Sequence, residues 1–231
     1  MSQFITTWLS DNQVGCYTNY MRKTPFVIGE FYHVYNRGAD KRTVFMALQD
    51  FDRFLQSMEW FNQIKPIGSI FEHSFIKPEL GGRTTKLVDI VCYCLNPNHF
   101  HMVLRQVADN GISEFMKRLG GYTRYINIKH QRSGVLFQGK FKSAHIDSNE
   151  YLLRVSAYVN LNNHVHRLGG KFRSSWNEYV WKSVHSICSK GIVLNQFKNK
   201  TEYKTFAEEA LRHILERKES AKEFTSLLLE K

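Results

Sequence analysis

Two histidines, His99 and His101, lie two positions apart in the segment "HFHMVLRQ", which otherwise has the composition of a buried β-strand. Side chains at positions i and i+2 of a strand point to the same face of the sheet. Both imidazoles therefore face one side, where they offer two nitrogen ligands to a metal ion. Buried histidines that hydrogen-bond to backbone carbonyls give the same pattern. The pair by itself leaves both interpretations open.

Two cysteines on the preceding predicted strand offer a different metal site. If Cys94 pairs with His99 across the hairpin, then Cys92, Cys94 and both histidines converge in a Cys2His2 zinc site. If Leu95 pairs with His99, the cysteines face the opposite side. Small buried cysteines are also ordinary core residues, and we favour this role for Cys92 and Cys94.

A third polar group for this metal site is available on a helix predicted to begin near Asp147 and to end near Asn162. Tyr158 and Asn162 are four residues apart in "AYVNLN", so they lie on one face of that helix. An amide oxygen is a metal ligand. An isolated tyrosine beside Leu153 and Leu161 is by default a residue of the hydrophobic core.

The remaining pattern predicts an α+β fold. Strands are expected at 31–38, 87–95, 99–106 and 137–146, and helices at 50–65, 112–131 and 147–162. The order β, α, β, β, α, β, α is typical of a ferredoxin-like antiparallel sheet with helices on one face. After residue 170 the sequence predicts a helical C-terminal extension with two short helices. We therefore expect an N-terminal extension (1–29), a main domain (30–170) and a C-terminal subdomain (171–231).

The composition favours a polyanionic partner. Thirty-two Lys and Arg residues against 21 Asp and Glu give a formal net charge of +11, which attracts nucleic acids. The segment 117–134 interleaves cations with aromatic rings, a pattern that suits phosphates and unpaired bases. Candidate nucleic-acid contacts in this segment and in the following basic strand are Arg118, Tyr122, Arg124, Tyr125, Lys129, Arg132, Lys140 and Lys142.

Other classes of protein are disfavoured by the sequence. Four cysteines at irregular spacing do not make a disulfide framework. No apolar run reaches the length of a membrane span, and no secretory leader is visible at the N-terminus. We expect a cytoplasmic, nucleoid-associated protein that has no membrane partner.

Three segments together resemble a known family. The strings "PNHFH" (97–101), "GVLFQGKFKS" (134–143) and "AYVNLNNHVHRLGG" (157–170) resemble the single-tyrosine HUH transposases, and among them the REP-associated tyrosine transposases. The segment "FYHVYNRG" (31–38) is similar to the first strand of that family. The likeness runs from about Phe31 to Trp181 and implies the HUH single-tyrosine transposase fold.

The resemblance implies a mechanism and a partner. It transfers the nucleophile to Tyr158, and the ligands of a divalent ion, Mg²⁺ or Mn²⁺, to His99, His101 and Asn162. It adds Gln138 to the candidate DNA contacts. The implied reaction cleaves single-stranded DNA next to a hairpin or palindromic repeat through a 5′-phosphotyrosine. The family contains monomers and homodimers, so both states stay open.

Two alternatives to this enzyme also stay open. One is a catalytically silent protein of the same fold that binds structured DNA or RNA. The other is a zinc protein that uses Cys92 and Cys94.

Overall fold

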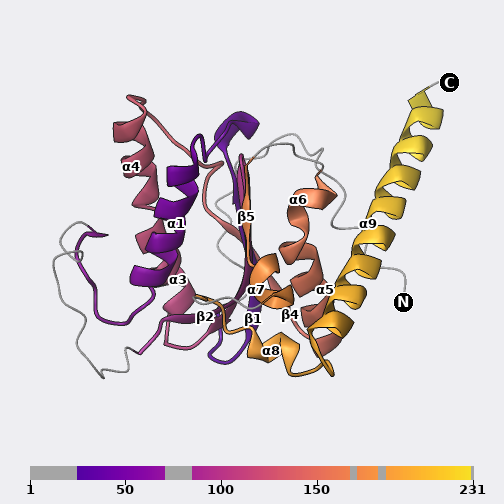
Figure 1. Cartoon of the computed structure of the whole chain (residues 1–231). Helices are drawn as coiled ribbons and strands as arrows, with labels where there is room; N and C mark the ends of the chain where they lie inside the picture. The colour runs from indigo at the N-terminus through magenta and orange to yellow at the C-terminus, as the bar shows by residue number, and fades with distance from the viewer. Residues whose placement is uncertain (1–24, 71–84, 167–170, 182–185, 230–231) are drawn as a thin grey trace.

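The computed structural model describes residues 25–70, 85–166, 171–181 and 186–229. Five strands and a series of helices alternate along the chain (Figure 1). The strands are β1 (Phe31–Arg37), β2 (Val88–Asn96), β3 (His99–Gln106), β4 (Lys142–Ile146) and β5 (Arg173–Ser174). The helices are η2 (Ala39–Lys41), α1 (Leu48–Trp60), α3 (Gly111–Leu119), α4 (Tyr122–Lys129), α5 (Asn149–Asn160), α6 (Asn162–Val165), α7 (Trp176–Val180), α8 (Gly191–Leu194) and α9 (Lys200–Leu229).

The strands form one antiparallel sheet in the order β4-β1-β3-β2-β5. The first four strands have the ferredoxin-like order, because the connection through α1 places β1 and β2 on either side of β3. The α+β class and the ferredoxin-like sheet predicted from the sequence are therefore confirmed. The short strand β5 is added at the outer edge of β2.

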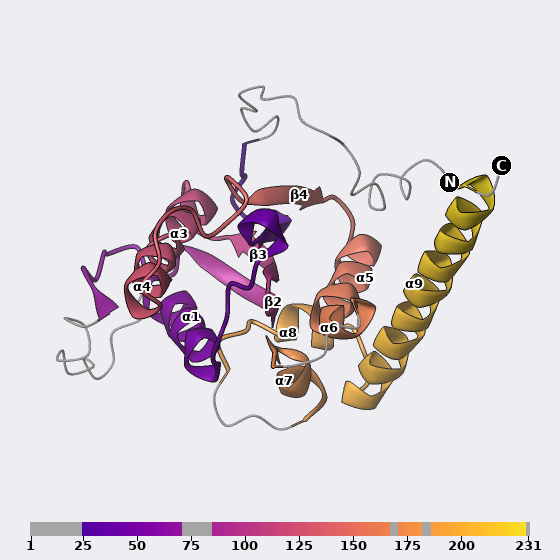
Figure 2. The same cartoon turned by 90° about the horizontal axis from the view of Figure 1, so that it is seen from above.

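Helices cover both faces of this sheet, whereas the sequence predicted helices on one face. Helices α1, α3 and α4 form the expected layer, and α5, α6, α7 and α9 lie on the opposite face (Figures 1 and 2). Strand β3 shows why two layers are needed. Phe100, Met102 and Leu104 pack in the first layer, and Val103 packs in the second. Because both faces of the central strands are apolar, both must be shielded from water.

Several predicted elements have different bounds. The helix expected at 112–131 is divided at Gly120 and Gly121 into α3 and α4. The strand expected at 137–146 is regular only from Lys142, because Gly139 turns the chain with a φ of +70°. The two short C-terminal helices expected after residue 170 are instead α7, α8 and the long helix α9. The N-terminal extension expected at 1–29 lies mostly outside the described residues.

No described helix has the apolar run that a bilayer span requires. This holds even for α9, the longest of them, which carries charged side chains along its length.

A buried carboxylate fixes the start of α1 and joins it to α4. The sequence predicted a helix from residue 50, but α1 begins at Leu48. The Asp50 carboxylate reaches back to accept hydrogen bonds from the backbone N–H groups of Met46 (2.9 Å) and Ala47 (2.8 Å). It also pairs with Lys129 Nζ at 2.6 Å and with His130 Nε2 at 3.2 Å. One fully buried side chain thus holds these two segments together.

The charge of Asp50 makes a pH-dependent contribution to stability. Burial raises the pKa of this carboxyl, but the Lys129 side chain and the N–H groups of Ala47 and Met46 outweigh it and hold the pKa below its ordinary value. A carboxyl whose pKa is lowered by folding stabilises the protein above its unfolded pKa of about 3.9. That contribution is lost as the pH falls through the lower pKa of the folded state.

We therefore expect Asp50→Asn to lower the free energy of unfolding by about 2 kcal/mol at pH 7, because charge-assisted hydrogen bonds are lost. The difference from the wild type should shrink as the pH falls below 4. Urea unfolding between pH 7 and pH 3 measures both effects. Asp52→Asn is the matched control, since Asp52 is exposed and pairs with Arg173 at the surface; its effect should stay below about 0.5 kcal/mol. Equal effects of the two substitutions would contradict this role of Asp50.

Candidate active site

The β2–β3 hairpin presents His99 and His101 on the face that α5 covers. The loop is the two residues Pro97 and Asn98, so Asn96 pairs with His99 and Cys94 pairs with His101. This register is neither of the two that we considered from the sequence, because Asn96 belongs to the strand. Both imidazoles are buried, His99 at 6% and His101 at 8% exposure. The two rings lie edge to face with centroids 5.2 Å apart.

The hydrogen bonds of His99 define which ring nitrogen carries the proton. Asn98 Nδ2 donates to the carbonyl of Lys41 at 3.1 Å, so Asn98 Oδ1 faces the imidazole. That oxygen lies 2.7 Å from His99 Nδ1 and accepts its proton. In the neutral ring the other nitrogen, Nε2, then carries a lone pair. His99 is therefore preset to ligate through Nε2.

A buried amide aligns His99 with Asn162. The Nδ2 group of Asn96 lies 2.9 Å from His99 Nε2 and 2.8 Å from Asn162 Oδ1, so its two hydrogens satisfy both acceptors. These acceptors stand 3.0 Å apart, and an ion that ligates both would replace the Asn96 hydrogens at their lone pairs. Two neighbouring ligands of an octahedral ion, with bonds of about 2.1 Å, are separated by about the same distance. The pair thus fits a small divalent cation.

His101 is aligned by a histidine that the sequence analysis did not single out. His33 on β1 places Nε2 at 2.8 Å from His101 Nδ1. Burial lowers the pKa of His33 to about 3, so this ring is neutral at pH 7. Burial, together with the neighbouring histidines, also lowers the pKa of His101 well below its ordinary value. With the His101 Nδ1 proton donated to His33, His101 Nε2 is a lone-pair donor.

Tyr158 on α5 lies against these rings. Its ring meets His101 edge to face at 5.6 Å between centroids, and it meets His33 in the same way at 6.0 Å. Asn162 follows one turn later, fully buried, with its Oδ1 at His99. The structure therefore brings together the four residues that the sequence nominated for chemistry, His99, His101, Tyr158 and Asn162, within one chain.

Helix α5 is attached to the rest of the chain by a buried polar cluster. Asn160 Nδ2 donates to the hydroxyl oxygen of Tyr203 on α9 at 2.8 Å, and Asn160 Oδ1 accepts from Ser175 Oγ at 2.6 Å. The backbone N–H of Tyr93 on β2 donates to the same Ser175 Oγ at 2.9 Å. Buried polar groups satisfied in this way favour one relative placement of the segments that carry them. The turn that follows Tyr158 is thus fixed to the sheet and to α9.

A third histidine joins the pair. The ligand nitrogens of His99, His101 and His166 all lie within 4.8 Å of one another. The sequence analysis named neither His164 nor His166 as a ligand, and both are exposed. The spacing could have indicated His166, because Tyr158, Asn162 and His166 follow one another at intervals of four residues.

The cysteines of the zinc alternative are buried core residues. Cys92 and Cys94 pack with Val103 beneath α5. Burial raises the pKa of the Cys94 thiol to about 12 and raises the pKa of Cys92 strongly. Thiols of this kind are poor metal ligands, because the thiolate is the form that binds. Among the described residues, the metal-ligand cluster contains histidines and neither cysteine.

The nine candidate DNA contacts are distributed over two faces. Arg118 donates to Glu114 and to the backbone carbonyls of Phe61, Gln63 and Ile64, so it closes the end of α1. Tyr122 is buried, with its hydroxyl donating to the Asp50 carbonyl. Packing within the protein accounts for both side chains.

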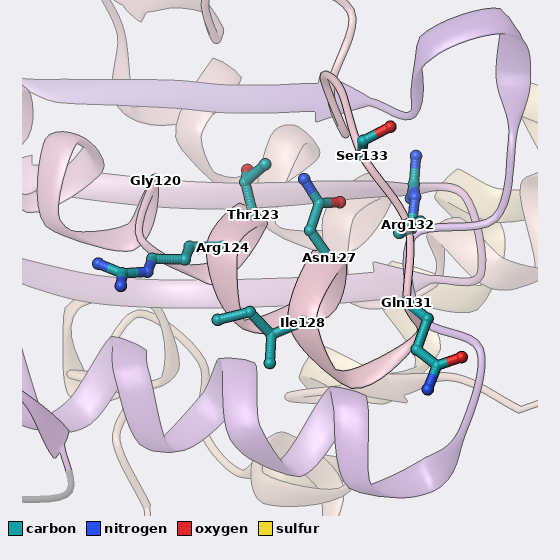
Figure 3. A pocket seen from close by; sticks show the side chains of 8 residues that line it. All are labelled: Gly120, Thr123, Arg124, Asn127, Ile128, Gln131, Arg132 and Ser133. Carbon is teal, nitrogen blue, oxygen red and sulfur yellow. The ribbon is translucent and has the colours of Figure 1, made fainter.

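Helix α4 and the segment after it carry four further candidates, Arg124, Tyr125, Lys129 and Arg132, on the layer opposite the histidines. Lys129 pairs with Asp50 and lies over the ring of Tyr125. Arg124 and Arg132 line a surface hollow of about 780 Å³ together with polar side chains such as Asn127 (Figure 3). This hollow is a basic surface on the other side of the sheet from Tyr158.

The remaining candidates lie at the end of the sheet near His99. Gln138 and Lys140 are exposed in the turn before β4, and the Gln138 N–H donates to the Arg37 carbonyl at 2.8 Å. Lys142 pairs with Tyr35, which in turn pairs with His101. Directly opposed residues of antiparallel strands point to the same face. The exposed Lys142 therefore lies two strands from His101, on the same side.

Comparisons with known proteins bear on this site. Residues 83–168 match the family model described as "Transposase IS200 like". A solved structure of a REP-associated tyrosine transposase bound to a REP hairpin has a TM-score of 0.46 and 13% sequence identity to this chain, and the match covers 74% of this chain and 89% of that one. Among curated proteins, none matches. The matched segment contains His99, His101, Tyr158 and Asn162, and the family is the one that the sequence motifs resemble.

Proposed function

We propose that this protein is a metal-dependent endonuclease and strand transferase for single-stranded DNA, with Tyr158 as its nucleophile. The observation that carries the proposal is the edge-to-face contact between Tyr158 and His101, 5.6 Å between ring centroids, beside the aligned acceptors of His99 and Asn162. The IS200-like family match over residues 83–168 supports it.

The ligands that we propose for the ion are His99, His101 and Asn162. His99 Nε2 and Asn162 Oδ1 are neutral donors held 3.0 Å apart by Asn96, a set that suits Mg²⁺ or Mn²⁺. A bound divalent ion supplies Lewis-acid polarisation of the scissile phosphate. Neutral protein ligands leave its positive charge available to the phosphate.

The proposed reaction is an in-line displacement at phosphorus. The Tyr158 oxygen forms a bond to the 5′-phosphate, and the bond from phosphorus to the 3′-oxygen breaks. The phenolic proton passes to solvent, and the departing 3′-oxygen takes up a proton to become a hydroxyl. Attack by a second 3′-hydroxyl on the phosphotyrosine reverses these bonds and joins two strands. The number of phosphoester bonds is conserved, so no nucleotide cofactor is consumed.

The proposed substrate is single-stranded DNA beside a hairpin or palindromic repeat, as the sequence resemblance implies. The net charge of +11 supports a nucleic-acid partner. Lys142, on the histidine face, is placed to meet the strand that is cut, and Arg124 and Arg132 offer a second basic surface for the folded part of the substrate. The location of Tyr158 beside histidines of its own chain supports cleavage within one protomer, in a monomer or a homodimer.

The first test is the covalent intermediate. Incubation with hairpin-bearing single-stranded DNA and Mn²⁺ or Mg²⁺ should give a protein–DNA adduct that survives denaturing electrophoresis. Tyr158→Phe should abolish the adduct, because it removes the attacking oxygen. Tyr151→Phe is the matched control on the same helix and should retain it. An adduct of unchanged yield in Tyr158→Phe would exclude Tyr158 as the nucleophile. Tight hairpin binding by the wild type with no cleavage in either metal would favour a catalytically silent binding protein.

A second test concerns Lys142. If its ammonium group neutralises one phosphate, Lys142→Gln should reduce the slope of log affinity against log salt concentration by about 0.7 and weaken binding several-fold. The affinity of the wild type and of the variant for a fluorescent single-stranded DNA is measured between about 50 and about 300 mM salt. The slope follows from these affinities. Lys86→Gln is the control, because Lys86 is exposed just before β2, at the end of the sheet away from the hairpin. A slope that stays the same in Lys142→Gln would remove Lys142 from the DNA surface.

A third test concerns His33 as a positioning residue. His33→Phe keeps an aromatic ring but removes the partner of His101 Nδ1, so the affinity of DNA-free protein for Mn²⁺ should fall about tenfold. His33→Asn, which restores an acceptor, should recover part of this loss. Tyr35→Phe, which keeps the neighbouring stacked ring, should bind as the wild type does. Isothermal titration with Mn²⁺ gives the affinities, and wild-type binding by His33→Phe would show that His101 needs no such support.

A further inference from the structure

His166 lies at the open side of the histidine cluster. It is the residue that ends α6, its side chain is exposed, and its ring meets that of His99 at 71° with centroids 4.8 Å apart. Its ligand nitrogen lies within 4.8 Å of those of His99 and His101. His99 and His101 approach from β3 and His166 from the end of α6, so the three rings surround a common point from two elements.

The position of His166 is fixed by backbone contacts. The His166 N–H donates to the carbonyl of Asn162 at 3.2 Å, which continues the helical turn that carries Asn162. On α9, Lys218 Nζ donates to the Val165 carbonyl at 3.0 Å. Helix α9 thus holds the end of α6 through the peptide unit next to His166. An exposed histidine at a helix end is often explained by the helix dipole alone, but the dipole gives no reason for the convergence with two buried histidines.

We infer that His166 is an additional ligand of the ion held by His99, His101 and Asn162, so that the site is a three-imidazole centre that favours late divalent transition metals over Mg²⁺. This inference rests on the proposed function, since it concerns the same ion. It raises the number of imidazole nitrogens in the ligand set from two to three, beside the one amide oxygen of Asn162.

The geometry identifies His166 as the ligand that moves. His99 Nε2 and Asn162 Oδ1 are held by Asn96, and His101 is held by His33. Two ligands of one ion with bonds of about 2.1 Å lie about 3 to 4 Å apart, so nitrogens up to 4.8 Å apart need a small approach. Rotation of the exposed His166 ring supplies it without disturbing the core. A third imidazole then closes the solvent side of the site.

The expected metal preference follows from ligand softness. Mg²⁺ prefers oxygen ligands, whereas imidazole suits Co²⁺, Ni²⁺ and Zn²⁺, and affinity for nitrogen ligands rises from Mn²⁺ to Ni²⁺. Removal of one imidazole should therefore weaken Co²⁺ binding much more than Mg²⁺ binding. The ratio of the two affinities reports whether His166 ligates, because a loss caused by local unfolding would lower both.

The experiment measures metal binding by the full-length, DNA-free protein. Titration with Co²⁺ followed by visible absorption, and with Mg²⁺ by calorimetry, gives both affinities. His166→Ala should weaken Co²⁺ at least about tenfold and change its absorption band, while Mg²⁺ affinity stays within about threefold. His164→Ala is the matched control, an exposed histidine two residues away that lies outside the cluster, and it should bind both metals as the wild type does.

The variant His99→Ala distinguishes a failure of the inference about His166 from a failure of the proposed metal site. Loss of Co²⁺ binding in His99→Ala, with wild-type affinity and absorption in His166→Ala, would overturn the inference and leave the proposed metal site intact. Wild-type Co²⁺ binding in His99→Ala, or no Co²⁺ binding by any protein, would overturn the metal site of the proposed function and the inference with it. Equal weakening of Co²⁺ and Mg²⁺ in His166→Ala would also overturn the inference, since it would indicate a structural role.

Discussion

The site depends on the side-chain amide of Asn96, which donates its two hydrogens to acceptors on different elements. One acceptor is His99 Nε2 on the β-hairpin, and the other is Asn162 Oδ1 beyond the tyrosine helix. Two lone pairs would otherwise repel each other at 3.0 Å. Because the Asn96 amide donates to both, it offsets this repulsion. It thereby couples the hairpin to the end of α5 and aligns two of the ligands that we propose for the ion.

The rest of the structure supports this coupling from two sides. In one layer, Asp50 ties the start of α1 to α4 and keeps the sheet covered on its far face. In the other, Asn160, Ser175 and Tyr203 connect α5 to β2 and α9. The histidines therefore lie on a sheet whose two helical layers are each attached by their own polar contacts. His33 and Asn98 then define the orientation of each imidazole through its second nitrogen, as is common around metal-binding histidines.

Much of this could be predicted from the sequence. The alternation in "HFHMVLRQ" placed His99 and His101 on one face, and the four-residue interval placed Asn162 below Tyr158. The ferredoxin-like order also follows from the succession of strand and helix periods. The hairpin register could not be predicted, because it depends on whether Asn96 belongs to the turn or to the strand. The second helical layer was missed because β2 and β3 are apolar on both faces, which a period-two pattern does not reveal.

The missed site residues share one property: their roles depend on contacts between distant segments. His33 on β1 meets His101 on the neighbouring strand β3, and His166 approaches His99 because α6 lies against β2. Arg118 and Tyr122 illustrate the opposite error. Their types suit DNA, but one closes a helix end and the other fills the core. Side-chain type indicates what a residue is able to bind, and packing determines whether it is presented to a partner.

The attachment of α5 to the sheet also limits how far a cleaved DNA strand could move. A DNA end joined to Tyr158 would be carried by a helix that is pinned to its own sheet by Asn160 and Ser175. The attached DNA end can then move only as far as the Tyr158 side chain can. The 5′ side of a break would stay close to where the break was made, so resealing in place requires only that the 3′-hydroxyl side is retained. Delivery to a new location requires the incoming strand to come to the protein.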